Sequence, residues 1–88
     1  MGRYGLQLGS LDRFMRQAAL ILSYLEEHGE TRWRELHDSY ATHFAGESLW
    51  RRVFEWLLHY GYLERPERGL YRITQRGREL LEALTPFL

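Results

Sequence analysis

Five polar side chains between positions 48 and 59 recur at the spacing of one helical face. Because successive residues of an α-helix are about 100° apart, these five fall within a sector of about 100°. The other positions of the segment are apolar, and a helix that is apolar over about two-thirds of its circumference is mostly buried. Only this stripe would then face solvent. The stripe consists of Ser48, Arg51, Arg52, Glu55 and His59.

The chemistry of the stripe allows two interpretations. An arginine can donate two hydrogen bonds to a guanine edge or bind phosphate, and a glutamate can accept a hydrogen bond from cytosine N4. Alternatively, Arg51 and Arg52 lie four and three residues before Glu55, so the three charges could pair on a solvated face. The stripe alone does not choose between contact with DNA and a solvated surface.

A second group of arginines lies in a predicted turn. Residues 62–73 are predicted to form two short strands joined by a turn over residues 65–69, because this segment contains a proline and a glycine. Arg65 and Arg68 lie within the turn. The sequence therefore predicts a β-hairpin with arginines at its tip.

Charge is unevenly distributed, although the chain of 88 residues has 12 basic and 12 acidic side chains. Residues 48–78 contain seven arginines against three glutamates, a net charge of +4, whereas residues 30–47 contain two arginines against four acidic residues, a net charge of −2. A local positive patch attracts phosphate groups. All twelve basic residues are arginines, which suits phosphate and guanine. Genome composition or a thermophilic source is the favoured explanation, because arginine also stands at positions with no plausible ligand.

Several classes of function are not expected. The chain has no cysteine or lysine, no glycine-rich phosphate loop and no close carboxylate pair, so we expect neither an enzyme nor a cofactor. No apolar run approaches the roughly 18 residues of a membrane span, and no signal peptide is recognised, so we expect no membrane partner and a cytoplasmic location. The histidines fit no zinc pattern, so we expect no metal site. They are His28, His37, His43 and His59.

The first long helix is predicted to begin at Ser10, as N-cap, and to end at His28 before Gly29. Residues 1–9 are rich in glycine and are predicted to form an arm or a short strand. Leu20 falls off the apolar face, beside Gln17 and Tyr24, and is assigned to a surface for a partner. The predicted core face consists of Phe14, Ala18, Ile21, Leu22 and Leu25.

Two further helices are predicted in the middle of the chain. One begins at Arg32 or Trp33 and ends near Gly46, and the next is capped by Ser48 and ends before Gly61. The aromatic side chains of this region are predicted to enter the core. These are Trp33, Phe44, Trp50, Phe54 and Trp56.

A last helix over residues 74–85 is predicted to be capped by Thr74. Gly77 lies on its apolar face, where a glycine costs about 1 kcal/mol relative to alanine. We therefore expect this helix to approach another backbone closely at Gly77.

The order of these elements resembles the winged helix-turn-helix family, in particular regulators of the MarR and PadR type. The most specific part is Tyr71 to Leu81, which follows the family pattern Tyr-x-hydrophobic-Thr-x-x-Gly-x-x-hydrophobic-hydrophobic. Over residues 11–84, the resemblance implies a mainly α fold with a small β-hairpin: a three-helix core, a wing and a C-terminal helix, in one domain of residues 1–88. The other matching positions are Gly29, Glu35, Leu36 and residues 57–63.

The resemblance also implies which residues contact DNA: the stripe, the wing and the start of the second helix. One departure is the spacing of Leu36 and Ser48, which are twelve residues apart, more than is usual in the family, so the extra residues 41–46 could change how the third helix is presented. The implied contacts are Ser48, Arg51, Arg52, Glu55, His59, Arg65, Arg68, Arg32 and Arg34.

We therefore expect sequence-specific binding of double-stranded DNA by a transcriptional regulator. The alternative is a winged helix that serves as a protein-interaction module in a larger assembly. For the regulator we expect a homodimer formed through the first helix and the chain ends, which leaves both third helices free for DNA. The apolar residues assigned to that interface are Tyr4, Leu6, Leu8, Leu20, Tyr24, Phe87 and Leu88.

Overall fold

The computed structural model describes the backbone of residues 2–40 and 47–88, with side chains for 11–38, 48–86 and 88. The fold is mainly helical, with a small three-stranded antiparallel sheet. None of the described helices is long and apolar enough to cross a membrane. The elements are α1 (Gly2–His28), β1 (Thr31–Arg32), α2 (Trp33–Tyr40), α3 (Glu47–His59), β2 (Leu63–Glu67), β3 (Leu70–Ile73), α4 (Gln75–Leu84) and a 3₁₀ turn η2 (Thr85–Phe87).

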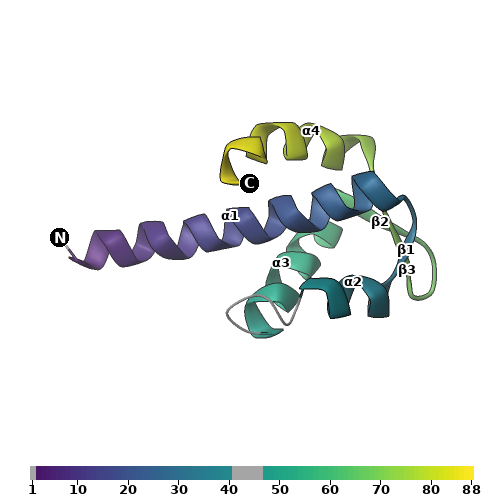
Figure 1. Cartoon of the computed structure of the whole chain (residues 1–88), viewed down its shortest axis with the longest axis horizontal. Coiled ribbons are helices and arrows are strands. Elements are labelled where there is room, and N and C mark those ends of the chain that lie inside the picture. Colours follow the sequence, from purple (N-terminus) through teal and green to yellow (C-terminus); the bar gives the residue numbers. More distant parts are fainter. Residues whose placement is uncertain (1, 41–46) are drawn as a thin grey trace.

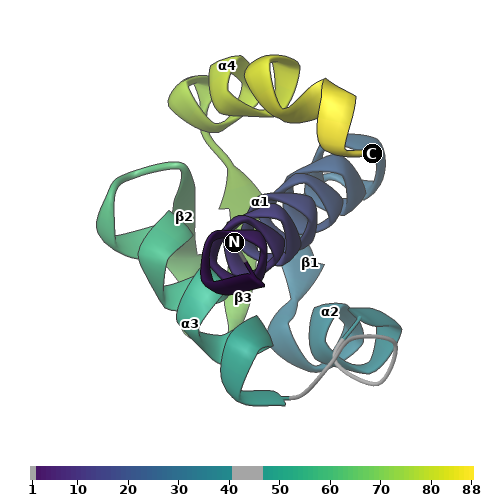
Figure 2. The same cartoon turned by 90° about the vertical axis from the view of Figure 1, so that its left-hand side faces the viewer.

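Helix α1 forms the centre of the molecule. Both views place α4 on one side of it and α2 and α3 on the other (Figures 1 and 2). Of the face predicted to be apolar, Phe14 is half-buried and the other four residues are fully buried. Gln17, which lies outside the predicted apolar face, is also fully buried. The sequence pattern recognised only one packed side of α1, because a helix covered on two sides has no single apolar face.

The start of α1 differs from the prediction. The helix already begins at Gly2, so the prediction of an arm or short strand over residues 1–9 is wrong for residues 2–9, and Ser10 lies inside the helix rather than at its N-cap. Propagating a formed helix adds one hydrogen bond per residue, and this stretch contains no proline to stop it. The first turns of α1 project beyond the other elements (Figure 1).

The sheet has the order β1-β3-β2, with both pairs antiparallel. The predicted two-stranded hairpin is present, but the prediction missed a third strand. This strand, β1, is only two residues long and pairs Thr31 with Tyr71 on the other side of β3. The turn is also shorter than predicted, since Arg65 and Pro66 belong to β2. Proline lacks the backbone donor of a central strand, but β2 is an edge strand with an irregular register at this point, where proline is tolerated.

The helix ends explain much of the local geometry. Gly29 adopts a φ of 73° directly after α1, as predicted, and its N–H donates to the Leu25 carbonyl. Thr74 caps α4, also as predicted, because its Oγ1 accepts a hydrogen bond of 3.0 Å from the Gly77 N–H. Ser48 is the second residue of α3 and not its cap. The predicted end of the second helix near Gly46, the insertion 41–46 and His43 and Phe44 lie outside the described residues.

Gly77 confirms the predicted close approach of the last helix. A Cβ at this position would overlap the Tyr62 carbonyl oxygen and crowd the Ile73 side chain. The carbonyl of Tyr62 is held in place, since it accepts a hydrogen bond from the Thr74 N–H. Glycine at position 77 therefore lets α4 lie against the start of the sheet.

Candidate nucleic-acid interface

The stripe of α3 is solvent-exposed at all five positions, as predicted from its spacing. The opposite face anchors the helix through Trp50, Val53, Phe54 and Leu57, which are all buried. Tyr60, just after the helix ends, is 51% exposed. Helix α3 is therefore fixed in the core along one side and presents one charged edge.

Two charges of the stripe are available for a ligand. Arg52 and Glu55 are one helical turn apart, which permits an ion pair. Among the described residues, however, no hydrogen bond or ion pair holds either of them. The predicted alternative, in which these charges neutralise each other, is not found for Arg52 and Glu55.

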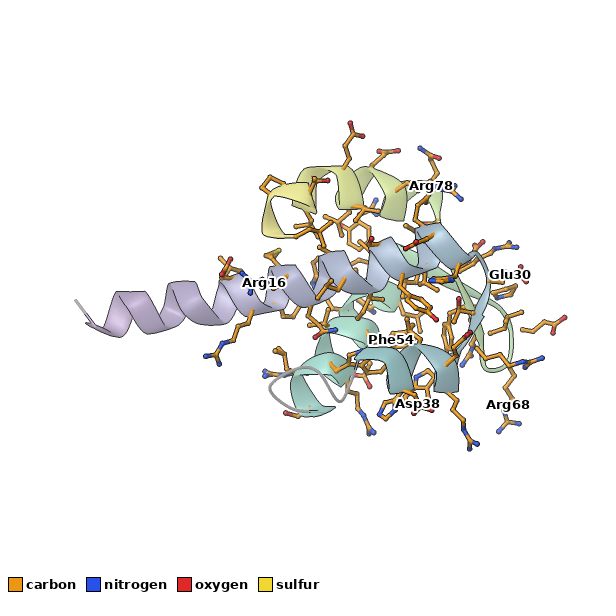
Figure 3. The ribbon with its side chains drawn as sticks, in the orientation of Figure 1. Arg16, Glu30, Asp38, Phe54, Arg68 and Arg78 are labelled. Carbon is orange, nitrogen blue, oxygen red and sulfur yellow. The ribbon has the colours of Figure 1, made fainter. Side chains whose placement is uncertain are left out.

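Strand β1 brings the start of α2 to the tip of the hairpin. Arg32 is the register partner of Leu70, and the Trp33 N–H donates a 2.9 Å hydrogen bond to the Gly69 carbonyl. Arg32 and Arg34 therefore lie near Arg68, more than thirty residues later in the chain. All three side chains are exposed, and Figure 3 shows Arg68 extending from the hairpin on the side of α2.

The start of α2 and the tip of the hairpin form a corner of the molecule. A hollow of about 400 Å³ lies between this corner and α3. Its aromatic lining is ordered by ring contacts: Trp33 meets Trp50 edge-on at 5.5 Å, and Phe54 meets Tyr71 edge-on at 4.8 Å. Charged residues of the stripe complete the lining, so α2, α3 and β3 meet at this hollow. The lining residues are Trp33, Trp50, Arg51, Phe54, Glu55, Leu58 and Tyr71.

A second hollow of about 440 Å³ lies on the other flank of α3, towards α1. Phe14 and Trp56 form its apolar wall, with their ring centroids 5.3 Å apart. Glu55 lines both hollows, and Arg52 and His59 line this one. The charged edge of α3 is thus a ridge between two depressions.

The remaining arginines of the second half of the chain are engaged within the fold. Arg72 on β3 pairs with Glu64 on β2 and, at 3.1 Å, with Glu30 after α1. Hydrogen bonding to Glu64 raises the pKa of Arg72, so this guanidinium stays charged. Arg78 on α4 pairs with Glu26 of α1 at 2.8 Å.

Arg76 lies over the ring of Tyr62, 5.0 Å from its centroid. The seven arginines of residues 48–78 therefore form two sets. Arg72, Arg76 and Arg78 contact side chains of the sheet and of α1, and the other four lie exposed on the stripe and the wing.

Two of the histidines, His37 and His28, lie against neighbouring aromatic rings. His37 stacks on Trp33 at 4.7 Å, and its Nδ1 lies 3.4 Å from Asp38. His28 ends α1 beside Tyr24, where a positive charge is favourable. Within the described part of the chain, no group of three or more histidine, aspartate or glutamate side chains could hold a metal ion.

The structure brings Arg32 and Arg34 close to Arg68, and the first hollow joins this corner to Arg51 and Glu55 on α3. Arg52 and His59 face the other flank of α3 instead, and Arg65 lies on the edge strand β2. The prediction missed β1, which makes the connection, and the roles of Trp33, Leu58 and Tyr71 in the hollow. A strand of two residues has no pattern of its own, so no sequence signal marks β1. Comparison with protein-family models, with curated proteins and with solved structures finds no match to this chain.

Proposed function

We propose that this protein binds double-stranded DNA sequence-specifically, as a winged-helix transcriptional regulator. The observation that carries the proposal is that exposed arginines lie on three segments joined by β1 and by the hollow between α2, α3 and β3. They come from the start of α2, the stripe of α3 and the hairpin. Such a set of guanidinium groups binds phosphates and guanine edges.

The topology supports the winged-helix assignment. A helix, a short strand, two more helices and a hairpin follow one another, and the first strand joins the sheet beside the last, in the order β1-β3-β2. In this proposal α3 enters the major groove, the hairpin is the wing, and the start of α2 contacts the backbone. The arginines of the wing and of α2 bind phosphates, while the stripe reads bases.

Binding to labelled duplex DNA tests the proposal directly. Fluorescence anisotropy should detect binding to a random pool of 20-base-pair duplexes at 50 mM salt. The affinity should fall steeply by 200 mM, because bound phosphates release counterions. Retention on heparin should follow the same dependence. Absence of duplex binding at 50 mM salt by a folded protein would refute the function.

We further propose a homodimer through α1 and the chain ends. Leu11 on α1 is 52% exposed and Leu88 at the C-terminus is 57% exposed. The first turns of α1 project from the body of the molecule, so a second copy can lie along them. Pairing with a second copy would cover these apolar groups and present two copies of α3 to half-sites about one DNA turn apart.

Light scattering at micromolar concentration measures the dimer. The expected mass is near twice the 10.6 kDa of one chain, and Leu11→Glu should move it towards one chain by placing a charge in the interface. Tyr60→Glu, which changes an equally exposed apolar residue after α3, is the matched control and should leave the dimer intact. A wild-type mass near one chain would refute the dimer.

The second candidate function is a protein-interaction module. The aromatic hollow between α2, α3 and β3 favours it, because aromatic residues and arginine anchor many protein interfaces. The two functions differ in salt dependence: weak retention on duplex DNA and heparin at low salt, with Trp33→Ala abolishing capture of a protein partner, would favour this candidate.

A further inference from the structure

We infer that Glu55 makes α3 select cytosine and reject non-specific DNA. The inference rests on the proposed DNA binding and deepens it, because it assigns a specificity-determining residue and the base that satisfies it. Its basis is the position of one exposed carboxylate in the middle of an otherwise positive edge.

The position of Glu55 is central in two ways. On the helical wheel it lies between Arg51 and Arg52, so any duplex that meets both arginines also meets the carboxylate. Among the residues that the structure describes, it is also the one that lines both hollows flanking α3. A ligand seated on either flank of the ridge is therefore close to Glu55.

Glu55 also differs from the carboxylates that the fold uses in ion pairs. Glu26, Glu30 and Glu64 are paired with arginines. Within the described residues, no ion pair holds Glu55, although Arg52 lies one turn away. Glu55 shares this state with exposed carboxylates such as Glu79, but it alone of them lies on the stripe of α3 between two arginines.

The electrostatic consequence is a penalty on contact with phosphates. Repulsion between a carboxylate and a phosphate about 4 Å apart in water weakens binding by about fivefold, and salt reduces this effect. The penalty is offset only where the carboxylate accepts a hydrogen bond from a base. In the major groove the cytosine N4 amino group is such a donor, and Arg52 can contact a guanine nearby.

The substitution Glu55→Gln separates these effects, because it keeps the size of the side chain and removes its charge. Binding to a random 20-base-pair duplex pool at 50 mM salt should tighten by about fivefold. The matched control is Glu79→Gln, which makes the same charge change at an exposed position of α4. This helix lies on the far side of α1 (Figure 1). The control should leave the affinity within twofold of wild type.

Selection from a random duplex library provides the second measurement. Wild type should enrich cytosine at one position, with a discrimination of roughly fivefold to a hundredfold over other bases. Glu55→Gln should enrich adenine at that position, because a glutamine amide makes two hydrogen bonds with adenine. Glu79→Gln should enrich the wild-type motif.

The outcomes separate the two proposals. If wild type and both variants fail to bind any duplex, the proposed function fails, and the role of Glu55 fails with it. If all three bind and Glu55→Gln matches Glu79→Gln in affinity and in the selected base, DNA binding stands and the role of Glu55 is refuted.

Discussion

The two sides of α1 use the same residue type for different purposes. On the side of α4, Arg78 is paired with Glu26, and at the sheet Arg72 is held by Glu30 and Glu64. On the side of α2 and α3, exposed arginines such as Arg52 and Arg68 have no acidic partner among the described residues. Figure 3 shows Arg68 and Arg78 on opposite sides of α1. An arginine count along the sequence therefore overstates the charge offered to a ligand, because part of it stabilises the fold.

The largest expected effect concerns the stripe. Replacing both Arg51 and Arg52 by alanine should weaken duplex binding by roughly 1–3 kcal/mol for each base contact that is lost, with loss of sequence preference. Arg78→Ala is the matched control, because this arginine pairs with α1 on the other side, and it should leave the affinity unchanged. A gel shift measures both. Unaltered affinity in a double variant that is folded by circular dichroism would remove α3 from the interface.

The next effect concerns the packing of α4 and should change the free energy of unfolding rather than the affinity for DNA. Gly77→Ala places a methyl group against the Tyr62 carbonyl, where backbone atoms cannot yield easily. Overpacking of this kind costs about 1–3 kcal/mol in the free energy of unfolding. Urea denaturation measures the loss, and the neighbouring exposed Glu79→Ala should show little change. Equal stability of Gly77→Ala and wild type would contradict the close approach of α4.

The wing should affect binding in a different way from the stripe. Replacing Arg65 and Arg68 by alanine should weaken binding about equally on all duplex sequences. The slope of log affinity against log salt should fall by roughly 1–2, because phosphate contacts are lost. Anisotropy titrations at several salt concentrations on two unrelated duplexes test this. Loss on only one duplex would show that the wing reads bases.

The smallest effect concerns Arg72, whose ion pairs are exposed to solvent. Arg72→Ala should lower Tm by no more than a few degrees, because solvent screens such pairs. Hydrogen bonding to Glu64 raises the pKa of Arg72 in the folded state, so its contribution is present below the ordinary arginine pKa and is lost only at higher pH. The Tm difference should therefore be constant between pH 6 and pH 9. A steep salt dependence of duplex binding that disappears in Arg72→Ala would instead assign this residue to the interface.

The sequence by itself determined the local elements of this protein. The polar sector of the third helix, the left-handed Gly29 and the Thr74 cap depend on neighbouring residues, and all three predictions are confirmed. The close approach at Gly77 could also be predicted, because glycine on an apolar helix face needs compensation. Each of these features depends on interactions within a few residues, or on a cost that one residue type imposes.

Only the tertiary structure decided what depends on distant residues. Strand β1 is two residues long and exists because β3 offers a free edge, so no local pattern predicts it. Gln17 is buried because α1 is covered on two sides, and Arg72 and Arg78 are engaged because glutamates more than forty residues earlier lie beside them. Which arginines remain available to a ligand was decided in the same way, because pairing depends on the positions of side chains in space and not on their order in the chain.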